Sequence, residues 1–388
     1  MPAPSDRLFT PRFFLMCGFS FTAFLSAFLL FPTAPFHIRD LGGSTVASGL
    51  FMACLTFSSA SSAPLTGAFA DRIGQRRTLI TSASVITLFS AGYAVIPDHR
   101  LVLVLAVLHG FFWSGLLTAS PAYMTGFLPP MRRAEGIGYW GFSSVAAVAV
   151  APSLGFWIYQ HGWFALCATT GALNLTMAVI AWRLPPDRVA VSHAQSPHPA
   201  GPLVEWRVMA LAGTLTMYSY SYGAVTSFAA MYAESTGVTP TAIYLTVLAL
   251  GILVTRPMSG KLADRLGYTR VLVPCLALIS VGIFLLQLGT GRIWHVLSAA
   301  VFGAGYGSAY PVFAAFVLQQ VDGRRRGAAF GAIVAAFDLG IGTGSLATGW
   351  IIQVSGYRTA FAVGGAISAL AIPYFLVARR WLAHEARV

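Results

Sequence analysis

The sequence predicts an all-α membrane protein in which twelve spanning helices form two six-helix bundles related by an internal repeat. Composition is the first observation behind this prediction. The chain of 388 residues is 56% hydrophobic and only 9% charged, whereas a soluble domain carries about 25% charged residues. The other two observations are the recurrence of charge-free stretches of spanning length and a motif that occurs twice. A soluble enzyme is excluded first, because so few charged residues cannot cover a water-facing surface.

Charge-free stretches mark the expected spans, because a spanning helix needs about 20 mostly apolar residues. One stretch, 136–182, is long enough for two helices with a turn at Gln160-His161-Gly162, and another is interrupted only by Asp338. The spans lie within 13–36, 41–70, 78–97, 101–131, 136–182, 208–233, 235–255, 271–291, 293–321, 327–357 and 359–378. These stretches give twelve spans. Each span is expected to be a helix, because backbone polar groups in lipid must be hydrogen-bonded within the segment.

The basic residues predict how the helices are oriented. With both termini in the cytoplasm, 19 of the 24 basic residues lie on the cytoplasmic side, four lie outside and Arg256 falls within a span. Such an excess on one side follows the positive-inside rule. Membrane topology therefore explains the net charge of +12, and no nucleic-acid partner is expected.

An internal duplication accounts for the even number of spans. The segment Gly67-Ala-Phe-Ala-Asp-Arg-Ile-Gly74 matches Gly260-Lys-Leu-Ala-Asp-Arg-Leu-Gly267 at an offset of 193 residues, and Gly162-Trp163 matches Gly356-Tyr357 at 194. Six helices separate equivalent points, so the two halves have the same orientation. We predict bundles at 1–183 and 205–388, joined by a Pro- and His-containing cytoplasmic linker at 184–204.

The duplicated motif resembles a known family signature. Gly67-x-x-x-Asp71-Arg72-x-Gly74-x-Arg76-Arg77 resembles the loop between the second and third helices of the major facilitator superfamily. Gly260-x-x-x-Asp264-Arg265-x-Gly267-x-x-Arg270 resembles its repeat in the second half. Within the superfamily, the chain is most similar to bacterial twelve-helix efflux transporters.

The resemblance implies a function. It implies a monomeric secondary active transporter of the bacterial cytoplasmic membrane, in which two domains rock around a central cavity. The expected activity is proton-coupled export of a small organic molecule, and the alternative is an importer or facilitator of the same fold. The partners expected are the solute, protons and the lipid bilayer, with no cofactor or metal, since the four cysteines show no metal-ligand spacing.

In this family, the residue equivalent to Asp71 caps a helix of the opposite domain and contacts loop arginines, and these contacts lock the outward-facing state. The resemblance therefore implies a gating role for Asp71 and Asp264. Gly67 and Gly260 are expected to let two helices approach closely. The alternative, simple membrane topology, explains the arginines but leaves the acidic residue and the glycines unexplained.

The first helix of the stretch 136–182 carries Ala147-x-x-x-Ala151-Pro152-Ser-Leu-Gly155-Phe156. This segment resembles the antiporter signature of the fifth helix in exporters, with Ala in place of two glycines and Phe156 in place of the last. Pro152 is expected to bend the helix and to leave a backbone carbonyl unpaired.

Two charges fall inside predicted spans, where a charge costs about 2.5–3.5 kcal/mol and marks function by default. Asp338 would lie about 18 Å and Arg256 about 12 Å from the same side at 1.5 Å per residue. We therefore predict an Arg256–Asp338 ion pair that acts either as a proton-linked or substrate-linked switch or as a static contact that holds the two helices together. His109, also in a span, either titrates or forms a neutral hydrogen bond that stabilises packing.

Aromatic residues on four helices are the candidates for the cavity lining, because the resemblance implies that the first, fourth, seventh and tenth helices surround the cavity. The alternative is that they are ordinary core or lipid-facing residues. The candidates are Phe24, Phe28, Phe112, Trp113, Tyr218, Tyr222, Tyr306 and Tyr310.

Overall fold

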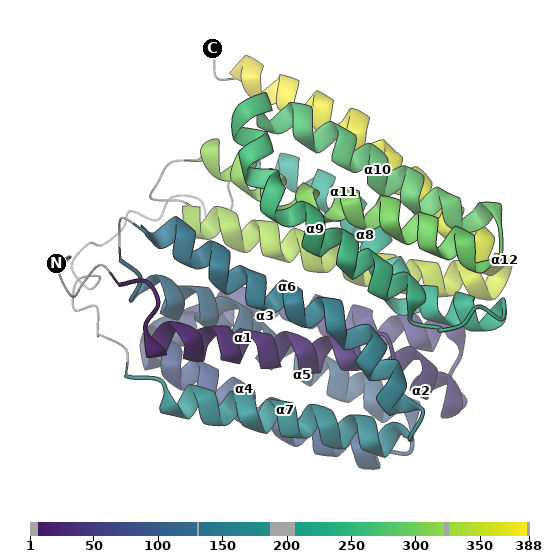
Figure 1. Cartoon of the computed structure of the whole chain (residues 1–388), viewed down its shortest axis with the longest axis horizontal. Helices are drawn as coiled ribbons and strands as arrows, with labels where there is room; N and C mark the ends of the chain where they lie inside the picture. The colour runs from purple at the N-terminus through teal and green to yellow at the C-terminus, as the bar shows by residue number, and fades with distance from the viewer. Residues whose placement is uncertain (1–6, 130–131, 187–205, 322–325, 386–388) are drawn as a thin grey trace. The chain divides into compact units, whose positions relative to one another are not determined.

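In the computed structural model, the described residues are 7–129, 132–186, 206–321 and 326–385, and all of their regular structure is helical (Figure 1). The predicted linker lies outside this part of the chain from residue 187 onward. The helices are α1 (Pro11–Leu30), α2 (Ala34–Asp40), α3 (Thr45–Ile73), α4 (Gln75–Val95), α5 (His99–Thr125), α6 (Arg133–Tyr159), α7 (Trp163–Arg183), α8 (Trp206–Ser235), α9 (Ile243–Leu266), α10 (Tyr268–Leu288), α11 (Arg292–Gln319) and α12 (Arg326–Glu385).

Twelve of the helical segments in the described chain are long, as predicted. Ten stretches are long and apolar enough to cross a membrane, and the last of them, Ala329–Trp381, is 53 residues long. It contains two helices, because Gly356 breaks α12 with a φ of 83°. Together with α8, which has 30 residues, these helices confirm the predicted all-α membrane fold.

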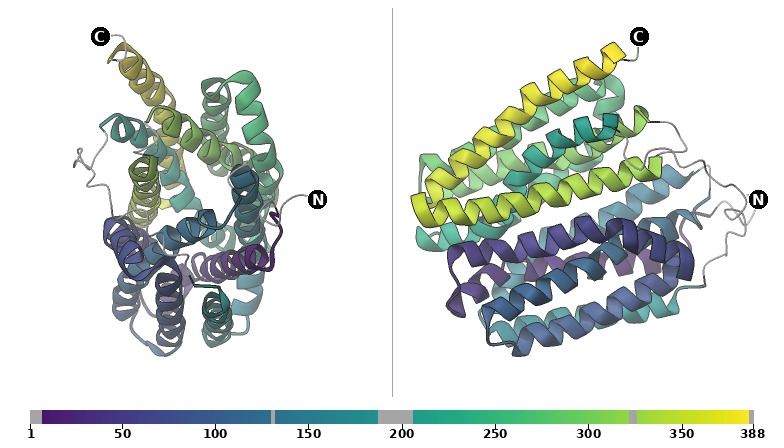
Figure 2. Two further views of the ribbon diagram at one scale, coloured as in Figure 1. Left: turned by 90° about the vertical axis from the view of Figure 1, so that its left-hand side faces the viewer. Right: turned by 180° about the vertical axis from the view of Figure 1, so that it is seen from behind.

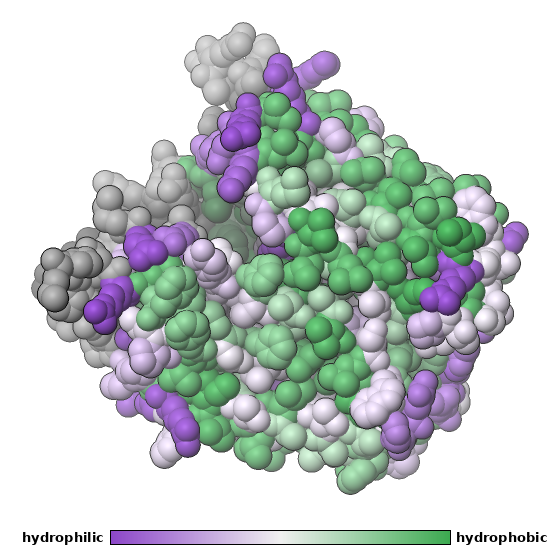
Figure 3. Space-filling model, in the orientation of Figure 1, coloured by the Kyte–Doolittle hydropathy of each residue, from purple (hydrophilic) through white to green (hydrophobic). Residues whose placement is uncertain are grey.

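The outer surfaces of the helices suit a lipid environment. Leu88, Phe164 and Trp182 are each more than two-thirds exposed, and hydrophobic side chains cover much of the face in Figure 3. Exposed apolar surface of this extent is not tolerated by a soluble monomer. The chain therefore forms a multi-pass membrane protein.

The boundaries of one span differ clearly from the prediction. The charge-free stretch 235–255 is represented by α9, which begins at Ile243 and continues to Leu266. Gly237, with a φ of 70°, lies in the turn that precedes it. The difference arises because a charge-free stretch marks only the part of the chain inside the membrane. The helix itself continues through charged residues until its backbone hydrogen bonds end.

The backbone repeats in the two halves as the sequence does. Glycines with positive φ occur in matched pairs: Gly74 with Gly267, Gly162 with Gly356, and Gly42 with Gly237. Residues other than glycine rarely adopt such angles. The first two pairs lie at the offsets of 193 and 194 found in the sequence and the third lies at 195, so the duplication relates equivalent turns of the backbone.

Helix packing follows the same repeat. The contacts group the chain into two compact units, Met1–Thr33 with Ser61–Gly201 and Ala34–Ala60 with Pro202–Val388. In the first unit α4 packs against α5 and α7, which Figures 1 and 2 show beside it, and α1 packs against α6. In the second unit α10 packs against α11 and α12, and α8 packs against α12. Equivalent helices thus make equivalent contacts in each unit.

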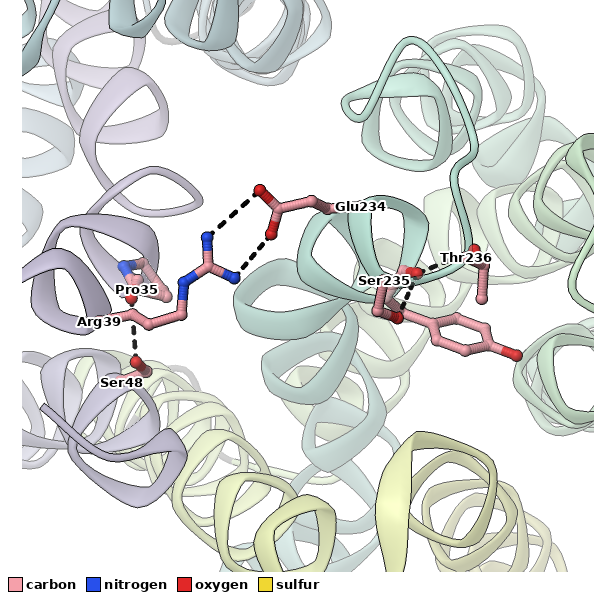
Figure 4. A network of polar contacts seen from close by, with 7 residues as sticks. Pro35, Arg39, Ser48, Glu234, Ser235 and Thr236 are labelled. Atoms are coloured by element: carbon pink, nitrogen blue, oxygen red, sulfur yellow. Dashed lines mark hydrogen bonds and ion pairs between the residues drawn. The ribbon is translucent and has the colours of Figure 1, made fainter. Parts of the chain in front are cut away.

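Residues 34–60 pack with the second unit, which the repeat does not predict. Arg39 of α2 forms a two-bonded ion pair with Glu234 of α8, with N···O distances of 2.6 and 3.2 Å (Figure 4). The Ser345 hydroxyl of α12 donates to the Gly49 carbonyl of α3 at 2.9 Å. The ion pair is exposed and contributes at most about 1 kcal/mol, whereas the Ser345–Gly49 hydrogen bond is buried.

Candidate functional site

The repeated loop has the same local structure in both halves. Gly74 and Gly267 have φ angles of 96° and 89° and directly precede α4 and α10. Four residues after each acidic residue, Gln75 donates to Asp71 and Tyr268 donates to Asp264, both at 3.4 Å. The two carboxylates thus have equivalent partners, although the amino acids that contact them differ.

The arginines of the loops are near the helix ends. Arg76 donates to the backbone carbonyl of Trp182 at the end of α7. The others, Arg72, Arg77, Arg265 and Arg270, are exposed. This placement fits both the membrane-topology explanation and the gating role that the resemblance implies.

The close helix approach predicted at Gly67 and Gly260 is absent from this structure. A Cβ atom built at either position would meet no atom within 4 Å. The tight glycine contacts occur elsewhere, for example at Gly344. The prediction failed because a small residue permits close approach but does not require it.

Replacing Gly74 with Ala should destabilise the first unit. The backbone at Gly74, with φ 96° and ψ 146°, is in a region that costs a residue with a Cβ about 1–3 kcal/mol. Gly67→Ala is the matched control, since it places the same methyl group in open space inside a helix. Thermal unfolding in detergent should show a lower midpoint for Gly74→Ala alone, and equal midpoints for the two variants would contradict the argument.

The α6 motif packs against α1. Ala147 and Ala151 are fully buried, in a cluster with Leu25 and Leu29. A Cβ atom at Gly155 would lie 3.0 Å from the Leu29 carbonyl oxygen. Pro152 lies within α6, which remains continuous from Arg133 to Tyr159. Small residues in this motif therefore allow two helices of the first unit to lie in close contact.

Three of the four aromatic candidates in the first unit come together. Phe24 of α1 lies 6.3 Å from Phe28 and 5.6 Å from Trp113 of α5, measured between ring centroids. Phe112 does not join them, because its ring packs against Phe89 of α4 at 5.8 Å. Adjacent helix positions point about 100° apart, so Trp113 and Phe112 cannot contribute to one surface.

His109 is buried between α5 and α4. Its Nδ1 lies 3.4 Å from the Tyr93 hydroxyl, and the Phe89 ring is 6.1 Å away. Tyr93 in turn accepts a hydrogen bond from Trp163 through its backbone carbonyl at 2.7 Å. These contacts are consistent with the alternative in which His109 forms a neutral hydrogen bond that stabilises helix packing.

All four aromatic candidates of the second unit form one cluster. Tyr218 and Tyr222 are four residues apart and so share one face of α8. Tyr222 stacks on Tyr306 of α11 with ring centroids 4.4 Å apart, and Tyr218 meets Tyr306 edge-on at 6.1 Å. Tyr310 joins them through Phe337 of α12, whose ring centroid lies 5.2 Å from that of Tyr310 and 6.4 Å from that of Tyr222. We call Tyr218, Tyr222, Tyr306 and Tyr310 the tyrosine cluster.

Arg256 and Asp338 both lie beside this cluster but do not form the predicted ion pair. The Arg256 guanidinium is within electrostatic range of Tyr222, Tyr306 and Tyr310. Tyr310 is also within range of Asp338. The prediction placed both charges at similar depth, but depth leaves the direction of each side chain open. Arg256 and Asp338 therefore both lie near the tyrosine cluster without forming an ion pair with each other.

Asp338 has a different partner, which the sequence analysis missed. Its side chain is 6% exposed and is hydrogen-bonded to Ser59 of α3. The second carboxylate oxygen, Oδ2, has no hydrogen-bond partner within the described chain. The serine-rich segment 58–62 was a signal for polar contacts in this span, but nothing in the sequence linked it to Asp338.

Comparison with known proteins identifies the class of protein. The family model of the Major Facilitator Superfamily matches residues 16–233 and again 209–387. Two matches in one chain agree with the repeat in sequence and backbone. The protein is a membrane transporter, and the chain belongs to the Major Facilitator Superfamily.

Relatives and solved structures agree with this family. The uncharacterised transporter YhhS of Escherichia coli K12 is 23% identical over 381 residues, covering 96% of this chain and 93% of its own. A transporter of the same type from Burkholderia pseudomallei is 25% identical, with coverages of 93% and 90%. The nucleoside transporter NupG has a TM-score of 0.74 at 15% identity, with 95% of this chain and 99% of that chain covered. A D-xylose–proton symporter has a TM-score of 0.75 at 16% identity, with coverages of 93% and 95%.

Proposed function

We propose that this protein exports a small organic molecule across the bacterial cytoplasmic membrane by alternating access, driven by the proton gradient, and that it works as a monomer with both termini in the cytoplasm. The observation that carries the proton coupling is Asp338. It is a buried carboxyl group inside a spanning helix, with one oxygen hydrogen-bonded to Ser59 and the other without a partner.

A carboxyl group in this position suits reversible proton binding. An ionised carboxylate in the membrane interior is costly unless it is paired, and no ion pair to Arg256 is present. Protonation removes the charge of Asp338. Exposure of Asp338 to water on one side of the membrane would then favour release of the proton. The Asp71 and Asp264 loops would couple this cycle to the movement between states, as the family resemblance implies.

Export is the proposed direction because the α6 segment around Pro152 and Gly155 resembles the antiporter signature of exporters in this family. Export driven by proton entry requires that the solute and the proton bind to the protein alternately and not at the same time. A solute that needs the ionised form of Asp338 would meet that requirement.

Import with the same fold is the second candidate, and Arg256 is the observation that favours it. A negatively charged solute at Arg256 is compatible with a protonated, neutral Asp338. Solute and proton would then be loaded together, which is the binding order of a symporter. A structural neighbour is a D-xylose–proton symporter, so the fold accommodates this order.

Flux in proteoliposomes with an imposed pH gradient tests both candidates. The purified protein should accumulate solutes from a panel of organic anions, cations and neutral molecules against their own gradients. For export by antiport, solute should move toward the more acidic side, opposite to the protons, and collapse of the gradient should stop it. Movement with the protons would support import instead, whereas flux that ignores the pH gradient would reject proton coupling.

A further inference from the structure

Arg256 is a cation inside a spanning helix to which the described part of the chain supplies no anion. It forms no ion pair among the described residues, and three tyrosines of the tyrosine cluster, Tyr222, Tyr306 and Tyr310, lie near its guanidinium. Asp338 is the acidic residue expected at the most similar depth in the membrane, and its side chain is hydrogen-bonded to Ser59 instead. A guanidinium without a counter-ion is suited to bind an anion.

Two hydroxyl groups of the tyrosine cluster also lack acceptors among the described residues. Tyr218 and Tyr306 are 0% and 6% exposed, and neither hydroxyl has a hydrogen-bond partner among the described residues. Buried polar groups are normally hydrogen-bonded, so each such exception needs an explanation. Tyr306 is within electrostatic range of both Arg256 and Tyr218. The cluster thus offers two hydroxyl donors, at Tyr218 and Tyr306, that have no acceptor among the described residues.

The surroundings of these donors are aromatic. Phe302 stacks on Tyr306 with ring centroids 5.7 Å apart, and Tyr222 stacks on its ring at 4.4 Å. Phe337 contacts Tyr310 and lies one position before Asp338 on α12. Apolar, aromatic walls with a few converging polar groups are typical of sites for small organic ligands.

We propose that Arg256, Tyr218 and Tyr306 form a subsite for the carboxylate of an aromatic organic anion, and that this anion is the transported solute. A guanidinium matches the two oxygens of a carboxylate, and the tyrosine hydroxyls can donate to the same oxygens. One arginine with neutral donors suits a single negative charge better than a phosphate with two. The inference rests on the transport part of the proposed function, and an anionic solute at Arg256 is the case described above for the import candidate.

Binding of matched probes to the purified full-length protein in detergent tests the subsite. The probes 2-naphthoate, 2-naphthamide and 2-naphthylmethylamine share an aromatic body and differ in the charge of the head group. The acid should bind about tenfold or more tightly than the amide, which is the usual effect of a charge-assisted hydrogen bond. The amine should bind no more tightly than the amide.

The variants assign that preference to residues. Arg256→Gln should remove the preference for the acid, Arg256→Lys should keep part of it because the charge remains, and Tyr306→Phe should weaken acid binding several-fold. Lys261→Gln is the matched control, since it removes an exposed cation from the same helix, α9, and should bind like the unaltered protein. Should Arg256→Gln fail to fold, Arg256→Lys and Tyr306→Phe still test the subsite.

Three results would overturn the inference. The first is equal affinity of the protein for 2-naphthoate and its amide. The second is a preference for the acid that survives both Arg256→Gln and Tyr306→Phe. The third is that a wider probe set, with benzoate, indole-3-acetate and their amides, also shows no preference for the acids. The binding assay uses no membrane and no gradient, so a failure of proton coupling would leave its result unchanged. Conversely, gradient-driven flux of cations or neutral solutes alone would reject the subsite while retaining the proposed function.

Discussion

Asp338→Asn is expected to abolish uphill transport driven by a proton gradient while leaving exchange of solute across the membrane intact. Asparagine has nearly the shape of aspartate and can still accept the Ser59 hydrogen bond, but it binds no proton in the physiological range. With one proton per solute, the gradient sustains about a tenfold concentration ratio per pH unit. In the variant this ratio should fall to one in proteoliposomes with an imposed gradient.

The matched control for this substitution is Asp98→Asn. Asp98 is exposed and caps α5 by accepting a hydrogen bond from the Arg100 backbone at 2.7 Å, and asparagine is an equally good cap. This variant should retain gradient-driven accumulation. Unchanged accumulation in Asp338→Asn would reject its role in proton coupling. Loss of exchange as well as accumulation would make Asp338 a structural or solute-binding residue instead.

Gly344→Leu is expected to prevent correct folding of the second unit. A Cβ atom at Gly344 would clash with the carbonyl oxygen of Tyr220 and would lie 2.6 Å from its carbonyl carbon. These atoms belong to the backbone of α8, which cannot move aside as a side chain can. Overpacking of a core ordinarily costs about 1–3 kcal/mol, and a clash with helix backbone should exceed that range. The yield of monodisperse protein in detergent should fall to background.

Gly331→Leu controls for the change in helix propensity, because it introduces the same side chain on α12. No atom lies within 4 Å of a Cβ built there, so the yield should match that of the unaltered protein. Normal yield and unfolding temperature in Gly344→Leu would show that α8 and α12 are not held in close contact at this position.

Much of the fold was predictable because the signals are local. A membrane span is determined by composition over about 20 residues, so twelve helices could be counted from charge-free stretches. The turns at Gly74 and Gly267 need a positive φ, and glycine at matching offsets indicated the duplication before any backbone was available. The tyrosines of α8 were similarly constrained, since Tyr218 and Tyr222 must share a face by helical spacing.

The sequence by itself determined the class of fold, the repeat, the family resemblance and which charges lie inside the membrane. Only the tertiary structure decided which of those groups meet. It separated Arg256 from Asp338, joined Asp338 to Ser59, placed Phe112 against Phe89 and left Gly67 without a close neighbour. The physical reason is that depth along a helix follows from residue counting, whereas the rotation of each helix about its axis is fixed by packing against neighbours distant in sequence.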